Sequence, residues 1–537
     1  MNRLAETLIL AEGWRRLLLL MAAGAVSALS VPPLFLLPAL FIGLPIWIWA
    51  LDGAEVTPGL GRVFGPAFQI GFAFGLGYFT VALNWLGAAF VQQGGIFLLL
   101  MPFAIVGLAA ILSLFWGLAS ALAHRFWSGG VYRLFAFAGS LALGEWARGH
   151  LFSGFPFDLI GYAFTANEPM MQTASLIGTY GLTVLGILVA VTPAIIWPAA
   201  RRPLPARLLP FFLAIAAVAL QFGYGQFRLS TTPIAPRTDM VARMVQPMIL
   251  DHQSFGVVNP AEIVSRLIGL SSARVGPAGQ ELDMVTQLVW PESVFPFFLT
   301  EYPVGIAQIG RMLPDKALLL TGAPRQALGD DGLPVPDNPG YNSILAIDPT
   351  GEVVASYDKS HLVPFGEYLP FQSFWKLFGI SQFVPGSAGW APGDGRRLMS
   401  PPGSPPFLAL VCYEAVFPGD IGDPNGAQYI LNVTNDAWFD GSMGPAQHAH
   451  HARLRAVETG LPLLRVANSG YTFATDPLGR VTASIPPGEA GAVDVVPTLP
   501  LSGGTLFNDL GDLPFWLFTL GFLALGGIAS FRRHGLR

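Results

Sequence analysis

The sequence predicts two kinds of structure in one chain: a multi-span α-helical membrane region and one α/β domain. Of the 537 residues, 52% are hydrophobic and only 12% are charged, whereas ordinary globular domains carry about 25% charged residues. Residues 1–230 contain long stretches without an ionisable group, and all three lysines lie between residues 300 and 380. We therefore expect a membrane protein with one polar domain. The net charge of −5 includes no basic block, which argues against nucleic acid as a partner.

Eight apolar stretches are candidates for membrane-spanning helices. A crossing takes about 20 mostly apolar residues. Pro32 and Pro33 separate the first two stretches, because proline breaks a helix. The alternative, buried helices of a large soluble protein, is disfavoured because nearly uncharged turns join the stretches. We place them near residues 15–30, 34–51, 65–89, 96–123, 132–147, 173–198, 206–223 and 513–531.

Arginine residues mark alternate connections between these stretches. The intervening connections SVPP and VQQGG contain none. The positive-inside rule then places both termini in the cytoplasm and the polar domain on the opposite face, which is the periplasm if the membrane is a bacterial inner membrane. The arginines on the cytoplasmic side are Arg3, Arg15, Arg16, Arg62, Arg125, Arg133, Arg201, Arg202, Arg207, Arg532, Arg533 and Arg537.

The polar residues 235–500 are predicted to form the α/β domain, between a seven-helix region at 1–230 and a C-terminal helix and tail at 510–537. Short β-rich runs alternate with helical patterns at 261–272 and 447–460, which favours a layered α/β fold over a β-sandwich. The predicted strands are 241–246, 284–290, 317–322, 342–348, 407–412, 428–434 and 463–468.

Three polar residues that follow strand-like runs can perform acyl transfer together. Cys412 is the only cysteine of the chain, and a free cysteine is often a buried core residue. A thiolate can also attack a carbonyl and hold the acyl group as a thioester. Glu292 can take the thiol proton as a general base, and Lys359 can stabilise the oxyanion. Each residue alone is weak evidence, and their order and sequence context carry the hypothesis.

The motifs around these residues resemble a known family. The runs WPES, DKSHLVPFGEYLP, CYE and NVTNDAWF occur in this order at 290–293, 358–370, 412–414 and 432–439, and they are similar to the nitrilase superfamily with its Glu–Lys–Cys triad. In combination with the apolar stretches, they resemble one branch, the apolipoprotein N-acyltransferases. The resemblance includes FGLGYFTVALNW at 74–85 and extends over essentially the whole chain.

The resemblance implies a nitrilase-like αββα sandwich and a role for each site residue. Glu292 would be the general base, Lys359 the oxyanion stabiliser and Cys412 the nucleophile. Further residues would support the site or contact substrate. Phe255 stands where family members often carry tryptophan, in the first loop of the domain. The full supporting set is Glu367, Tyr413, Glu414, Phe255, Asn435 and Trp375, with Trp375 in an apolar segment, 371–384, that we expect to act as an interfacial lid.

The family also implies a reaction without a cofactor. An acyl chain would pass from a membrane phospholipid, phosphatidylethanolamine in the first instance, to Cys412. It would then pass to the α-amino group of the diacylglyceryl-cysteine at the N-terminus of an apolipoprotein. Both substrates are lipid-anchored, so a site held close to the membrane gains effective concentration. We expect the protein to act as a monomer in the bacterial inner membrane.

Two other functions are compatible with parts of the sequence. A membrane-tethered amidase would hydrolyse small amides, but one span would suffice as its anchor. A transporter or scaffold with an inactive domain would be expected to have a broken triad or ionisable residues deep in several spans.

Two further groups of residues invite a functional reading. His448, His450 and His451 suggest a metal, but no acidic or cysteine ligand lies at zinc spacing, so we expect no metal. Glu145 and Arg148, at the end of a stretch, are spaced for an i,i+3 pair or for a contact with a lipid headgroup.

Overall fold

The computed structural model describes residues 2–55, 57–198, 203–249, 259–276, 279–329, 333, 335, 338–373, 377 and 389–534. It divides into two compact units. The helical unit comprises Met1–Thr232, Gly441–Gln447 and Asp509–Arg537, and the α/β unit comprises Pro233–Asp440 and His448–Asn508.

A helix lies at each of the eight apolar stretches, but fewer than eight are clearly long enough to cross a membrane. Four described helices have the required length and hydropathy, α7, α10 with its 3-10 extension, α11 and α17, and a fifth candidate is the bent pair of helices within 66–93. α2 and α3 have 15 residues each, short of the roughly 20 that a crossing needs. The eight helices are α2 Gly13–Ser27, α3 Pro38–Asp52, α5 Pro66–Ala82, α7 Ile96–Arg125, α8 Tyr132–His150, α10 Ala174–Ala190, α11 Leu204–Thr231 and α17 Leu513–His534.

The helical unit encloses an ion pair within an aromatic core. Glu145 and Arg148 of α8 are both fully buried, and their side chains are 3.0 Å apart. Trp116 of α7 donates to Glu145 at 2.7 Å, and Arg148 donates to the carbonyl of Phe157 at 2.8 Å. The predicted i,i+3 pair is therefore present, and its hydrogen bonds hold the connection after α8 against the helices.

The α/β unit contains two six-stranded sheets, whose orders are β12-β1-β2-β3-β4-β5 and β11-β10-β9-β8-β7-β6. β1, β2 and β3 are parallel, as are β7, β8 and β9. The strands are β1 Ala242–Gln246, β2 Gln287–Trp290, β3 Leu318–Arg325, β4 Tyr341–Ile347, β5 Val353–Asp358, β6 Leu398–Met399, β7 Phe407–Val411, β8 Tyr429–Thr434, β9 Leu463–Ala467, β10 Thr472–Thr475, β11 Val481–Ile485 and β12 Gly491–Val495.

Side chains that alternate between the two faces of each strand allow the sheets and helices of this unit to pack in layers. Alternate residues of a strand point to opposite faces of the sheet, and in β7 Phe407, Ala409 and Val411 face a core shared with the first sheet. Leu408 and Leu410 face the opposite way, toward α15. β7 is therefore apolar on both faces, as a strand buried on both sides must be.

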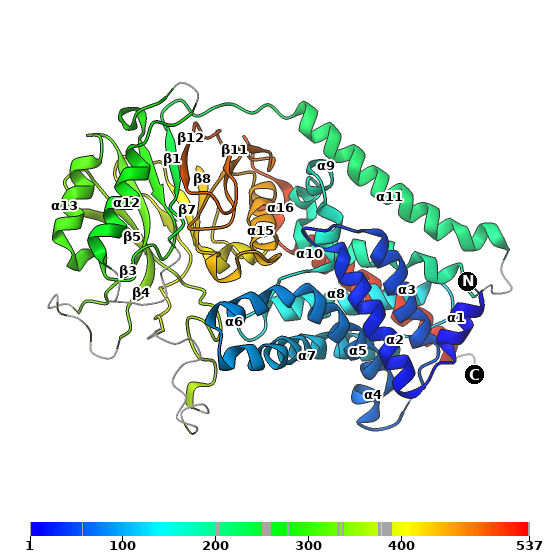
Figure 1. Ribbon diagram of the computed structural model, residues 1–537. Coiled ribbons are helices and arrows are strands. Elements are labelled where there is room, and N and C mark those ends of the chain that lie inside the picture. Colours follow the sequence, from blue (N-terminus) through cyan, green and yellow to red (C-terminus); the bar gives the residue numbers. More distant parts are fainter. Residues whose placement is uncertain are drawn as a thin grey trace. The chain divides into compact units, whose positions relative to one another are not determined.

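Helices cover the outer faces of the two sheets, which gives the αββα sandwich (Figure 1). α12 (Pro260–Ser272) and α13 (Pro303–Met312) pack on the first sheet, and α15 (Gly444–Thr459) packs on the second. All seven predicted strands and both predicted helices are present, with ends shifted by a few residues. α13 and five further strands were not predicted from the sequence; these strands are β5, β6, β10, β11 and β12.

A glycine in β3 keeps the strand ends of the first sheet close together. A Cβ atom on Gly322 would lie 2.5 Å from Cα of Glu292 and 2.7 Å from the carbonyl oxygen of Pro291. Real Cβ atoms do not approach backbone atoms this closely. The position of Glu292 therefore depends on the missing side chain at Gly322.

We expect Gly322→Ala to displace Glu292 and to lower the reactivity of Cys412 about tenfold or more, because a small misplacement of a catalytic group is costly. The measurement is the rate at which iodoacetamide alkylates the only cysteine of the chain. Gly269→Ala is the matched control, because a Cβ there meets no atom within 4 Å. Equal rates for both variants would contradict this view of Gly322.

Candidate active site

The candidate site lies at one edge of the α/β unit, where strand ends of both sheets meet. Glu292 follows β2, Lys359 follows β5, Cys412 follows β7 and Asn435 follows β8. β4 runs antiparallel to β3 and β5, so its first residues lie at the same edge. Ligands of α/β folds commonly bind at the carboxyl ends of strands, which makes this edge the candidate active site.

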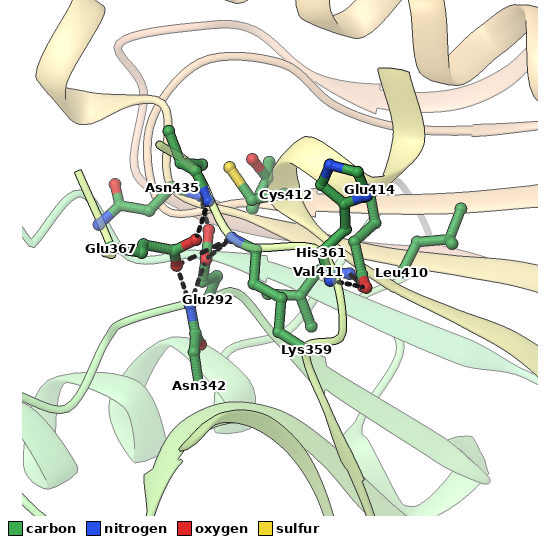
Figure 2. A network of polar contacts seen from close by, with 12 residues as sticks. Glu292, Asn342, Lys359, His361, Glu367, Leu410, Val411, Cys412, Glu414 and Asn435 are labelled. Atoms are coloured by element: carbon green, nitrogen blue, oxygen red, sulfur yellow. Dashed lines mark hydrogen bonds and ion pairs between the residues drawn. The ribbon is translucent and has the colours of Figure 1, made fainter. Parts of the chain in front are cut away.

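The Lys359 ammonium lies between two carboxylates, as Figure 2 shows. Its Nζ is 2.9 Å from Oε1 of Glu367 and 3.4 Å from Oε1 of Glu292. Burial alone would lower the pKa of Lys359, but the two carboxylates outweigh it and hold that pKa above its usual value. Lys359 is therefore a fixed positive charge, suited to stabilising an oxyanion.

Glu292 is buried and accepts hydrogen bonds from Lys359, described above, and from two further donors. Asn342 donates to its Oε1 at 2.7 Å, and the backbone N–H of Asn435 donates to its Oε2 at 2.9 Å. Burial raises the pKa of Glu292 above its ordinary value, and the charge of Lys359 opposes the rise. A carboxylate whose pKa is raised in this way is a stronger proton acceptor, as a general base must be.

Cys412 begins the 3-10 helix η7 (Cys412–Val416) directly after β7 and is half-buried. Its φ of +49° is uncommon for a residue with a Cβ. Burial, followed by the charge of Glu292, raises the pKa of the thiol, and Lys359 acts against the rise. The thiol is thus neutral at rest and needs a base to become a nucleophile.

Glu367 and Asn342 connect the groups around the lysine. Glu367 also accepts from the backbone N–H of Val363 at 2.8 Å. Asn342 donates to Glu367 at 3.0 Å as well as to Glu292, so one amide bridges both carboxylates. Asn342 was not predicted from the sequence, because one asparagine at the start of a strand carries no signal of catalysis.

Glu414 joins the lysine loop to the cysteine strand. Its Oε1 accepts from the Tyr357 hydroxyl and from both the backbone N–H and the hydroxyl of Ser360, each at 2.9 Å. Its Oε2 accepts from the backbone N–H of Val411 at 2.8 Å. Because Glu414 is fully buried, these bonds fix Cys412 relative to Lys359.

The remaining residues of the predicted set differ in their places. Tyr413 is buried and packs against the rings of Phe417 and His361, with centroids 5.0 and 5.8 Å away. Its ring supports η7. Phe255 and Trp375 lie outside the described residues.

Two family models match the chain. The apolipoprotein N-acyltransferase N-terminal domain matches residues 23–192, and the carbon-nitrogen hydrolase model matches residues 316–499. The apolipoprotein N-acyltransferase of Bradyrhizobium diazoefficiens is 40% identical over 521 residues, which is 96% of this chain and 95% of that protein. This chain belongs to the apolipoprotein N-acyltransferase family.

Other members and one solved structure are also similar to the chain. The apolipoprotein N-acyltransferase of Rhodopseudomonas palustris is 38% identical over 96% of this chain and 95% of that protein. The protein of the same name from Agrobacterium fabrum is 40% identical over 96% of each chain. An amidase of the nitrilase superfamily from Nesterenkonia is 17% identical, covers 50% of this chain and 93% of its own, and has a TM-score of 0.33.

The ionisation of Glu292 is expected to control the reactivity of Cys412 toward acyl donors at low pH. Because burial raises the pKa of Glu292, the acid limb should lie above pH 4.5, the ordinary value. Lys359→Met removes the charge that lowers this pKa and should move the limb to higher pH. Asn342→Ala, which removes a hydrogen bond with the same effect, should move it the same way.

The measurement is the rate of Cys412 acetylation by p-nitrophenyl acetate between pH 4 and pH 8, followed by intact mass. Lys316→Met, at an exposed lysine, is the control and should leave the limb in place. A limb that moves to lower pH in the Lys359 variant would contradict the assignment of the base.

Glu414→Gln should weaken the connection between the lysine loop and the cysteine strand. Glu414 accepts the four hydrogen bonds given above and a fifth from the backbone N–H of His361 at 3.1 Å. The NH₂ group of a glutamine must therefore face at least one of these donors. An unsatisfied buried group costs about 1–3 kcal/mol, and we expect a lower thermal midpoint and slower acetylation of Cys412. Glu352→Gln, at an exposed residue, is the control. An unchanged midpoint and rate in Glu414→Gln would refute this role.

Proposed function

We propose that the protein is an N-acyltransferase that moves a fatty acyl chain from a membrane phospholipid to the N-terminus of lipoproteins. The observation that carries the proposal is the family relationship over at least 95% of both chains, helical unit included. The meeting of Glu292, Lys359 and Cys412 at one buried edge supports the chemistry.

The first half of the reaction loads the cysteine. Glu292 takes the thiol proton as Sγ of Cys412 attacks the ester carbonyl of the phospholipid, and Lys359 stabilises the oxyanion. The bond between the carbonyl carbon and the glycerol oxygen then breaks. Glu292 returns the proton to that oxygen, a lysophospholipid leaves, and the acyl group remains as a thioester.

The second half transfers the acyl group. The neutral α-amino group of the diacylglyceryl-cysteine attacks the thioester carbonyl, and Lys359 again stabilises the oxyanion. Glu292 takes one amine proton and gives it to the sulfur as the C–S bond breaks. The products are an N-acylated lipoprotein and the free thiol, so protons and bonds balance in this ping-pong cycle.

The proposal includes the arrangement of the chain in the membrane. Helices lie at all eight apolar stretches, and arginines mark alternate connections. Eight crossings, with short helices such as α2 and α3 among them, would put both termini in the cytoplasm. Residues 235–500 would then be periplasmic in a bacterial inner membrane, between a seven-helix region at 1–230 and a last helix and tail at 510–537. We propose a monomer with phosphatidylethanolamine as donor.

The thioester is the intermediate to test. Purified protein incubated with phosphatidylethanolamine and no acceptor should gain the mass of one fatty acyl group, because Cys412 is the only cysteine. Hydroxylamine should remove the added mass, and a peptide with an N-terminal diacylglyceryl-cysteine should take up the acyl group.

Cys412→Ala should stay unmodified, and Cys412→Ser should transfer at most a trace, with both variants folded. An unmodified mass for folded wild-type protein, or full transfer by Cys412→Ala, would contradict the thioester mechanism. Hydrolysis of small amides by the same preparation would then favour the amidase alternative.

A further inference from the structure

The histidines of α15 have different surroundings. Burial, with the charges of Arg453 and Arg455, lowers the pKa of His450 to about 3. Burial also lowers the pKa of His451 well below its ordinary value, so both rings are neutral. His448 instead lies against a carboxylate, with its Nδ1 2.8 Å from Oδ1 of Asp436.

Both ring nitrogens of His448 face acceptors. Nε2 is 3.0 Å from the backbone carbonyl oxygen of Cys412, and a carbonyl can only accept, so Nε2 carries a hydrogen. Nδ1 faces the carboxylate of Asp436. The ring therefore donates to Cys412 from one edge, while Asp436 contacts its other edge.

Arg465 keeps Asp436 ionised. Its guanidinium donates to Oδ2 of Asp436 at 2.7 Å, and both side chains are buried. Burial acts to raise the pKa of Asp436, but Arg465 and His448 lower it below its ordinary value. The same guanidinium nitrogen is 3.2 Å from Nδ1 of His448, so its shorter contact is with the carboxylate.

This arrangement acts on the strained residue of the site. Cys412 has a φ of +49°, and such a conformation persists when surrounding contacts hold it. The hydrogen bond from His448 ends on the carbonyl of that same residue. Sγ of Cys412, a carboxylate oxygen of Asp436 and a ring nitrogen of His448 all lie within 4.8 Å of one another.

These three groups could also be considered as ligands of a metal ion. A metal would require one nitrogen of His448 to give up its hydrogen bond, and Asp436 to bind it beside the guanidinium of Arg465. A nearby positive charge opposes a bound metal cation, so the observed contacts favour the hydrogen-bonded ring over a metal ligand.

We propose that His448 is a positioning residue: its ring, fixed by Asp436 and Arg465, holds the backbone of Cys412 in the conformation that presents the sulfur. This inference rests on the nucleophilic role of Cys412 in the proposed function. It adds a second set of residues, on α15, β9 and the loop after β8, to the Glu–Lys–Cys set.

The test is the rate of Cys412 alkylation by iodoacetamide, followed by intact mass in the full-length protein. In His448→Gln an amide nitrogen can reach the position of Nε2, whereas in His448→Asn it reaches only that of Nδ1. We expect His448→Gln to be alkylated at a rate within about threefold of the wild-type rate. His448→Asn and His448→Ala should lower the rate about tenfold or more, because the buried carbonyl of Cys412 then loses its hydrogen bond. Acyl transfer should lose kcat in the same order with KM unchanged.

Controls and outcomes separate this inference from the proposed function. His450→Gln on the same helix should alkylate at the wild-type rate, and the thermal midpoint identifies variants that fail to fold. A wild-type rate in folded His448→Ala, or equal rates for Gln and Asn, would overturn the inference. The inference would also be overturned if micromolar Zn²⁺ slowed alkylation of the wild type but not of His448→Gln, because His448 would then be a metal ligand. Alkylation needs no lipid and can therefore be measured without acyl transfer. If the variants show the expected order of alkylation rates but the wild type transfers no acyl group, the proposed function alone would be overturned.

Discussion

The site depends on one buried cation, Lys359, shared by the buried carboxylate of Glu292 and the half-buried carboxylate of Glu367. Removing charges from water is costly. Hydrogen bonds within this group and to neighbouring residues offset that cost for Lys359, Glu292 and Glu367. One ammonium serves both carboxylates, and the Asn342 amide bridges the same two oxygens. The two carboxylates keep the lysine protonated. Burial is the main cause that raises the pKa of Glu292 and of the Cys412 thiol, and the charge of Lys359 opposes both rises. The electrostatics of the reaction thus follow from this three-charge group.

The rest of the α/β unit holds these charges in register. Strands of both sheets end at the same edge, so residues distant in sequence become neighbours without long loops. At two places the fit is tight: Gly322 lets two strand ends approach, and Glu414 binds the lysine loop to β7. Neither residue takes part in proton transfer, yet both determine where the reacting atoms lie.

Much of the fold could be predicted because it rests on local patterns. Central strands such as β7 and β8 are short apolar runs that end in polar residues, and the helix pattern at 261–272 matches α12. The outer strands β11 and β12 were missed because exposed residues in β11 and half-buried residues in β12 break their apolar pattern. The number of crossings could not be fixed, because α2 and α3 are shorter than their apolar stretches. Glu292, Lys359 and Cys412 were found through their motifs, whereas the contacts of Asn342 and His448 depend on tertiary structure.

The neutral state of the Cys412 thiol has a consequence for its chemical durability. Oxidants and disulfide-exchanging proteins attack or use the thiolate far more readily than the thiol. On the periplasmic face that we propose, the surroundings are oxidising, and an ordinary free cysteine would be at risk there. Here Glu292 takes the thiol proton only as the sulfur attacks a bound carbonyl, so a free thiolate does not persist. The chain also contains no second cysteine that could form a disulfide with Cys412. The arrangement that times acyl transfer therefore also protects the nucleophile from oxidation between turnovers.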